Sequence, residues 1–375
     1  NIRGNIPGHI LEETVEEIFV NIAKPHKYDP AVAEKQVFKR EIPDVRAAFH
    51  SMNFQKVYKA TIQNDQLRQA FLSWQGITDL IAKVVDSMYT GMEYDEYTVM
   101  KYMICREALN GGMYVNANAA YATDIDSLIE DTRWLSSQLT FLKPTFNRAG
   151  VYNSTSRDDQ YVIIDSRVEA QVDVEVLARA YNMDRADFLG HLIIVDSFAE
   201  HDNARLAELF ADDDTYTPFT QAELTSLAAI QSITVARDWW MVFDNFQNFT
   251  QNYNGEGLYW QYWYHTWKTF SASPYANAAV LTSQASSVTG VTVSPATANV
   301  AQGSMLQLNA TVAGTGLIDR TVIWSISGQE ASGTHIDGGS GLLRIAADEE
   351  AGTEITVTAE CQGATGTATI TVTEA

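Results

Sequence analysis

The 375-residue sequence is poor in cysteine, in basic residues and in long apolar runs, and each scarcity excludes a class of protein. Two cysteines, Cys105 and Cys361, are too few and too far apart for a disulfide framework or a clustered zinc site. The 25 Lys and Arg residues face 47 Asp and Glu residues, and the formal net charge of −22 opposes binding to phosphate backbones or anionic membranes. No apolar run reaches the roughly 18 residues of a membrane-spanning helix. We therefore expect no membrane association and no tight binding of nucleic acid.

Motifs for catalysis and for cofactor binding are also lacking. The 7 histidines are scattered, and neither H-E-x-x-H nor G-x-S-x-G occurs. Asp165 and Asp196 each follow an apolar strand-like run, a position where open α/β folds often bind ligands. Asp is equally common in turns and helix caps, and no His, Lys or metal-ligand spacing accompanies these two. We favour the capping role and predict no catalytic residue, no cofactor and no metal.

Composition changes sharply at the small polar segment 283–287, which we interpret as a linker between two domains. Of the 40 aromatic residues, 39 precede it and only Trp324 follows. The tail, 288–375, has no Lys, and Arg320 and Arg344 face nine acidic residues there. Val, Ile and Thr alternate with other residues at 291–293, 306–312, 321–325, 355–359 and 367–372. This period of two, punctuated by Gly and Pro, predicts an all-β sandwich with Trp324 in its core.

The larger part, 1–282, mixes helical and strand patterns. Apolar residues recur at helical spacing over 77–88, where Leu80 and Val84 lie on the apolar stripe, so we expect both to be buried. An Asp at either position should cost several kcal/mol. Further helices are expected at about 95–110 and from Thr123 or Asp124, and a strand–helix–strand unit at 161–195.

Two aromatic runs, 239–243 and 259–267, are read as strands of the same part. The second run could stack on sugars, as aromatic strips of carbohydrate-binding modules do. It could equally pack inside a sheet or against another subunit, and we favour packing.

The first 60 or so residues differ from the rest of this part. Strands are expected at 16–22 and 57–62, and prolines and charges fill the segment between them. Such a segment buries little surface by itself, so we expect an extended arm or hairpin that needs a partner surface. The candidate contact residues are Lys24, Lys27, Lys39, Arg40 and Glu41.

Several stretches of the larger part resemble the major capsid proteins of the phi-29 group of short-tailed Bacillus phages. They keep their order and include Val37-Phe38-Lys39-Arg40-Glu41-Ile42-Pro43, Ala60-Thr61-Ile62-Gln63-Asn64-Asp65, Val174 to Met183, and Gly257 to Trp267. Region 196–236 aligns with nothing in that group. The tail resembles the group 2 bacterial immunoglobulin-like domain, on Val291 to Pro295, Gln307 to Val312, Ile323-Trp324-Ser325 and Ile355 to Ala359.

The first resemblance implies an α+β Hong Kong 97-type capsid fold, and the second a C-terminal immunoglobulin-like sandwich. Residues 1–64 would be the extended loop and its flanks, 65–110 the spine helix region of the peripheral domain, 111–245 mainly the axial domain, and 246–282 the return to the peripheral domain. Many copies would form hexamers and pentamers around double-stranded DNA, without sequence-specific contact. A scaffolding protein, a portal and head fibres would be the partners, and assembly would take place in the bacterial host cytoplasm.

An alternative is a secreted cell-surface adhesin or carbohydrate-binding protein. It accounts for the tail and for the aromatic run at 259–267. It does not account for the capsid-like stretches, or for the lack of a secretory pattern in the first residues. Under the capsid hypothesis the two domains should fold independently, so that a chain ending near Thr282 still forms closed shells.

Overall fold

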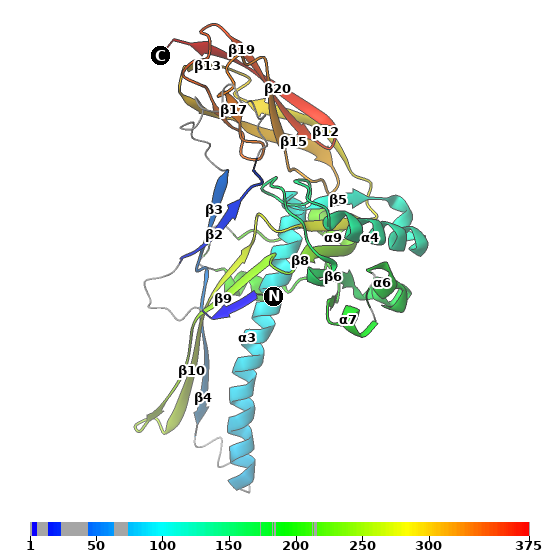
Figure 1. Cartoon of the computed structure of the whole chain (residues 1–375). Helices are drawn as coiled ribbons and strands as arrows, with labels where there is room; N and C mark the ends of the chain where they lie inside the picture. Colours follow the sequence, from blue (N-terminus) through cyan, green and yellow to red (C-terminus); the bar gives the residue numbers. More distant parts are fainter. Residues whose placement is uncertain are drawn as a thin grey trace.

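The computed structural model describes residues 2–5, 14–23, 44–63 and 74–374, apart from 173, 182, 184, 212, 214 and 215. The chain up to Thr282 forms a body of helices and sheets, and a tail made of strands sits on one end of that body (Figure 1). In the part of the chain that is described, no helix combines the length and apolar character needed to cross a membrane.

A single long helix, α3 (Trp74–Asn110), runs along the whole body (Figure 1). Its 37 residues cover the two helices expected at 77–88 and 95–110, which are continuous because no proline interrupts them. The helix ends at Gly111, whose φ of +73° is the left-handed conformation of a glycine C-cap.

The lower half of α3 packs on a four-stranded sheet. The strand order is β1 (Ile2–Asn5), β9 (Trp240–Asn254), β10 (Tyr259–Ala272) and β4 (Phe54–Gln63). Alternate residues of β10, among them Tyr262 and Tyr264, face Met88 and Met92 of the helix in a small apolar cluster. Packing between sheet and helix therefore accounts for Trp260, Tyr262 and Tyr264, whereas Trp267 lies on the opposite face and packs on Phe246 of β9.

The upper half of α3 packs on a five-stranded sheet, which has an apolar core on each face. Its order is β5 (Tyr114–Ala117), β11 (Ala278–Thr282), β8 (Ile230–Ala236), β6 (Gln160–Asp165) and β7 (Leu192–Val195). Strands β6 and β7 are parallel neighbours, as the expected strand–helix–strand unit requires.

Short helices complete the body. They are η1 (Ala119–Ala122), α4 (Ile125–Leu139), η2 (Arg157–Asp159), α5 (Ser166–Gln171), α6 (Val174–Ala180), α7 (Arg185–Leu189), α8 (Asn203–Leu209) and α9 (Gln221–Ala228). Helices α4 and α6 cover one face of the five-stranded sheet, and α9 lies near α3 on the other. Region 196–236, which the resemblance left unmatched, supplies α8, α9 and β8 and is an integral part of the body.

Near the junction with the tail, β2 (Thr14–Val20) and β3 (Val45–Ser51) pair as an antiparallel two-stranded sheet, hereafter the hairpin. Strand β2 lies close to the strand expected at 16–22, whereas β3 was not expected from the sequence.

The tail strands surround one apolar core that includes Trp324, which is 7% exposed. They pair as β12 (Ser287–Ser294) with β15 (Asn309–Thr315), then β13 (Thr297–Ala301)–β20 (Ala364–Thr373)–β19 (Glu354–Cys361)–β16 (Ile323–Ser327), and β14 (Met305–Gln307)–β18 (Leu342–Arg344)–β17 (His335–Ile336). The run expected as one strand at 306–312 is divided at Leu308, which is fully buried.

The beginning of segment 283–287 is held against the body, whereas its last residue, Ser287, already belongs to β12 of the tail. The backbone N–H and the hydroxyl of Ser283 both donate to the carbonyl oxygen of Ala229, at 2.9 and 3.1 Å, and Gln284 N donates to Thr282 Oγ1. These bonds are not those of a free flexible linker.

Candidate assembly surfaces

The hairpin has one face on the body and one face in solvent. Side chains alternate between the two faces because a strand has a period of two. On the inner face Phe19 stacks on Tyr275, with ring centroids 5.2 Å apart. Glu17 accepts a hydrogen bond from Ser273 Oγ at 2.6 Å and lies 3.2 Å from Nε2 of the buried His50, so the inner face is held by both apolar and polar contacts.

The outer face of the hairpin is apolar and exposed. Ile18 is 61% exposed, Val20 58%, Val45 53% and Phe49 68%. Val20 pairs with Val45 and Ile18 with Ala47, so these side chains form one continuous patch. A contiguous apolar patch rimmed by polar residues usually marks an interaction surface.

The hairpin also carries the candidate contact loop of the sequence analysis. Lys24, Lys27, Lys39, Arg40 and Glu41 all lie outside the described residues. The two ends of that segment are side by side, because Asn21 N donates to the Asp44 carbonyl oxygen at 2.9 Å and Asn21 Nδ2 donates to Asp44 Oδ2 at 3.1 Å. The described residues on either side of 24–43 are therefore adjacent at one end of the hairpin.

Buried ion pairs fix α3 to its neighbours. Asp95 is fully buried and accepts two hydrogen bonds from Arg205, at 2.7 and 2.9 Å, and one from the hydroxyl of Tyr58 at 2.6 Å. Burial and the carboxylate of Asp95 raise the pKa of Tyr58, so the phenol stays protonated. A buried carboxylate deprived of its cation destabilises a protein strongly, so the pairing holds β4, α3 and α8 in one arrangement.

A second buried pair joins the same helix to β10. Lys268 Nζ lies 2.7 Å from Glu96 Oε2 and 2.8 Å from Asp244 Oδ1, and the Lys268 side chain is only 2% exposed. The lysine ammonium thus bridges α3 and β9 from within the sheet.

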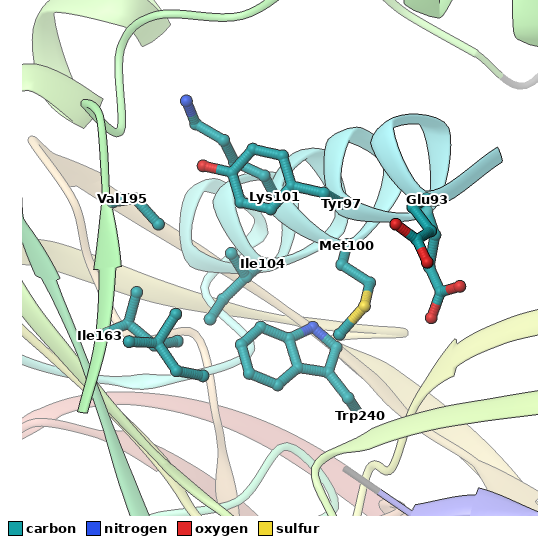
Figure 2. Close-up of a pocket in the computed structure, with 10 residues that line it drawn as sticks. Glu93, Tyr97, Met100, Lys101, Ile104, Ile163, Val195 and Trp240 are labelled. Atoms are coloured by element: carbon teal, nitrogen blue, oxygen red, sulfur yellow. The ribbon is translucent and has the colours of Figure 1, made fainter. Parts of the chain in front are cut away.

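A pocket of about 320 Å³ lies between α3, β6, β7 and the first residue of β9. Figure 2 shows Trp240 across from the helix residues Met100 and Ile104, with Ile163 and Val195 to one side and Glu93 at the other. Trp240 Nε1 has no hydrogen-bond partner among the described residues. The lining carries three charged side chains, Glu93, Glu96 and Lys101. Glu96 is paired with Lys268 and Lys101 with Asp196.

The two carboxylates weighed as catalytic candidates do come to one edge of the five-stranded sheet. Asp165 ends β6, and Asp196 follows the neighbouring β7. Asp165 caps α5 by accepting a hydrogen bond from Arg167 N at 2.7 Å. Asp196 pairs with Lys101 and accepts from Tyr97, and these bonds keep the pKa of its carboxyl below the usual value although burial opposes them. Both side chains have structural partners.

The three candidate core residues have different environments. Trp324 lies in the tail core, whereas Leu80 and Val84 are half-buried and pack at the margin of the small α3–β10 cluster. Sequence reasoning did not single out Arg46, Arg320 or Asp337, which join the hairpin, the body and the tail. The only available signal was that Arg320 is one of two cations in an acidic tail.

Comparison with known proteins shows that the chain is similar to phage major capsid proteins. A sequence model of the family described as "Phi29-like phage major capsid protein" matches residues 11–282. The "Major capsid protein" of Bacillus phage PZA is 34% identical over 355 residues, which are 93% of this chain and 72% of that protein. The protein of the same name from Bacillus phage B103 is also 34% identical, over 92% and 72% of the two chains.

Solved structures agree at the level of the fold. A chain from the capsid structure of Staphylococcus phage Andhra superposes with a TM-score of 0.57 at 15% identity, covering 76% of this chain and 82% of that one. A chain from the structure of head fiber and inner core protein gp22 of native bacteriophage P68 gives a TM-score of 0.55 at 15% identity, over 75% and 83%.

Proposed function

The chain belongs to the Phi29-like phage major capsid proteins, which form the shells of phage heads, and we propose that its hairpin and the loop 24–43 make the contact with a neighbouring copy. The observation that carries this proposal is the apolar outer face of the hairpin, with Phe49 68% exposed. A two-stranded hairpin is marginal by itself, so an apolar face left in water is best explained by a partner. An adhesin or sugar-binding role is not favoured.

We assign the finer parts of the fold on the same basis. In a Hong Kong 97-type arrangement, α3 would be the spine helix, the β1–β9–β10–β4 sheet the peripheral domain and the five-stranded sheet the axial domain. Two boundaries then move from those expected: β9 enters the peripheral sheet at Trp240, and β11 (Ala278–Thr282) returns to the axial sheet. The tail would be a group 2 bacterial immunoglobulin-like domain, which its strands around Trp324 support.

The mode of action follows from charge and from number of copies. Hexamers and pentamers of identical subunits would close by many individually modest contacts. The net charge of −22 would leave enclosed double-stranded DNA mobile. A scaffolding protein, a portal and head fibres would be further partners, assembly would occur in the host cytoplasm, and the subunit would act structurally and not as an enzyme.

Deleting 24–43 tests the contact. The deletion leaves two residues, Ile22 and Ala23, between Asn21 and Asp44, which already bond to each other. Replacing these two residues by Asn-Gly gives a two-residue turn of the kind that joins antiparallel strands. We expect a soluble subunit with an unchanged melting transition that forms no closed shells in electron microscopy.

Surface variants separate the two parts of the proposed contact. Phe49→Ser removes an exposed apolar side chain, so it should leave melting unchanged and weaken shell formation. The matched control, Tyr253→Ser on β9, changes another partly exposed aromatic residue and should assemble normally. Closed shells from the loop deletion, or loss of its melting transition, would contradict the proposal.

A further inference from the structure

The tail contacts the body through two consecutive residues, Leu317 and Ile318, whose side chains lie in different apolar cores. Leu317 is 3% exposed and belongs to the apolar core of the body, whereas the next residue, Ile318, is 2% exposed and belongs to the core of the tail. Two successive side chains thus fill two different cores. If the tail were attached only through its linker, Leu317 would not be buried in the core of the body.

The tail also caps the end of α3. Arg320 Nη1 donates to the carbonyl oxygen of Leu109 at 2.9 Å, and Arg320 N donates to that of Gly111 at 3.0 Å. The last carbonyl groups of a helix lack partners within the helix and carry its negative dipole end, so an arginine here satisfies both needs. A Cβ at Gly111 would lie 2.6 Å from the Ile318 carbonyl oxygen, so the fit is close.

The same tail reaches the hairpin through Arg46 of β3. The Arg46 guanidinium donates to the Ala149 carbonyl oxygen of the body at 2.7 Å and forms an ion pair with Asp337 of the tail. The Asp337 carboxylate is oriented by the backbone N–H groups of Gly339 and Ser340, at 3.0 and 3.3 Å. The Arg46 and Asp337 side chains are 13% and 24% exposed, so the pair is largely shielded from water.

We propose that the tail positions the hairpin for assembly, with Arg46 and Asp337 as the positioning residues. Leu317 and Arg320 fix the tail to the body and to the end of α3, and Asp337 then holds β3 at a set place relative to that helix. This inference rests on the proposed role of the hairpin as a contact between copies. It gives the tail a function inside the subunit, whatever it faces outside.

Hydrogen exchange of the full chain, measured on the unassembled subunit, tests the coupling directly. In Asp337→Asn the amide oxygen can still accept from Gly339 and Ser340, but the tail no longer places a charge opposite Arg46. Arg46 keeps its ion pair within the hairpin, with Asp44 Oδ2 3.2 Å from Nη2, so only the link to the tail is weakened. Arg46 donates to the same Oδ1, so the substitution replaces a charge-assisted hydrogen bond by a neutral one. We expect the amides of β2 and β3 to exchange roughly fivefold to thirtyfold faster, the range for weakening one partly shielded bond of this kind. Exchange of the tail strand β19 should not change.

A double-mutant cycle and a matched control decide the cause. If the pair acts as a unit, Asp337→Asn adds little to the faster exchange already produced by Arg46→Gln. Asp348→Asn removes an exposed acidic group from the same tail and should leave the hairpin unaffected. Unchanged hairpin exchange in Asp337→Asn, or an equal rise throughout the tail, overturns the positioning role.

Electron microscopy of the same variants separates this inference from the proposed function. Fewer closed shells together with a loosened hairpin support both. A loosened hairpin with normal shells leaves the positioning role intact and contradicts the assembly role of the hairpin.

Discussion

At the junction of body and tail, the carboxyl group of Asp319 is 5% exposed, and its burial raises its pKa to about 7. Asp319 Oδ1 accepts a hydrogen bond from Thr321 N at 2.7 Å, which opposes the rise without cancelling it. The residue follows Leu317 and Ile318 directly, so its ionisation takes place where two cores meet. The charged form is therefore disfavoured by the fold itself.

This shift makes stability depend on pH in a defined direction. The folded-state pKa of about 7 exceeds the ordinary value of 3.8, so between these values the folded protein binds more protons than the unfolded chain. Asp319 thus favours folding at low pH, and this contribution is lost as pH rises through 7. Asp319→Asn keeps an acceptor for Thr321 N and cannot ionise.

Relative to this variant, the wild-type chain should lose about 2–3 kcal/mol of unfolding free energy between pH 5 and pH 8. Denaturant titrations at the two pH values measure the difference, and the exposed Asp348→Asn serves as control. Equal pH dependence in wild type and Asp319→Asn would show that the carboxyl group is already ionised at pH 5.

The contacts made by single residues at the domain junction could not be predicted from the sequence. Composition gives the number of charges in the tail but not their partners, so Arg320 and Asp337 looked like ordinary surface residues. Trp324 was predictable because it is the only aromatic residue among alternating apolar strands. For Leu80 and Val84 the sequence predicted the correct face of the helix but too much burial. Periodicity shows which face of a helix is apolar, and not how completely the neighbouring sheet covers it.

At the scale of elements, the helical spacing of apolar residues is interrupted within α3 although the helix itself is continuous. Around Gly91 the helix passes from the β4–β10 cluster to the core of the body, so its apolar stripe changes position and the pattern is interrupted. Strand β3 was missed for a related reason. Val45, Ala47 and Phe49 recur at every second residue but lie on the exposed face, while Arg46 and His50 face the body, so the short apolar alternation does not mark a buried face.

Gly91→Ala should stabilise the body. Glycine in a helix interior is about 0.5–1 kcal/mol less favourable than alanine. A Cβ at position 91 would meet the Tyr58 ring at 3.7 Å, an ordinary van der Waals contact. Chemical denaturation should therefore show a gain of up to about 1 kcal/mol.

The same substitution at the end of the helix provides the contrast. Gly111 has a φ of +73°, and a Cβ there would lie 2.6 Å from a backbone oxygen, so Gly111→Ala should destabilise the chain. A loss of stability in Gly91→Ala would mean that α3 and β4 are packed more tightly than their distances indicate.

At the scale of the whole molecule, the order of domains was predictable from the change of composition near 283, but their docking was not. A polar linker and an acidic tail are equally compatible with a mobile appendage and with a fixed one. What fixes the tail is one apolar side chain, one helix cap and one ion pair, contributed by Leu317, Arg320 and Asp337. None of these has a sequence pattern of its own.

Truncation at Thr282 measures what this docking contributes. The truncated body keeps both sheets and α3, so it should still fold. It lacks Asp337, which pairs with Arg46 of the hairpin, so we expect it to form fewer closed shells than the sequence alone led us to expect. It loses Leu317 from its core, a loss worth about 2–5 kcal/mol, and the arginine at the end of α3. We therefore expect the melting temperature of the body to fall by on the order of 10 °C.

Leu317→Ala in the full chain should reproduce part of that fall, because it empties the same site while the tail stays in place. Leu306→Ala is the matched control: Leu306 packs only at the margin of the tail core, so its loss should weaken the tail without lowering the melting temperature of the body. An unchanged melting temperature in both the truncated chain and Leu317→Ala would show that the tail rests on the body without stabilising it. A truncated chain that cannot fold would show instead that the body depends on the tail from the start.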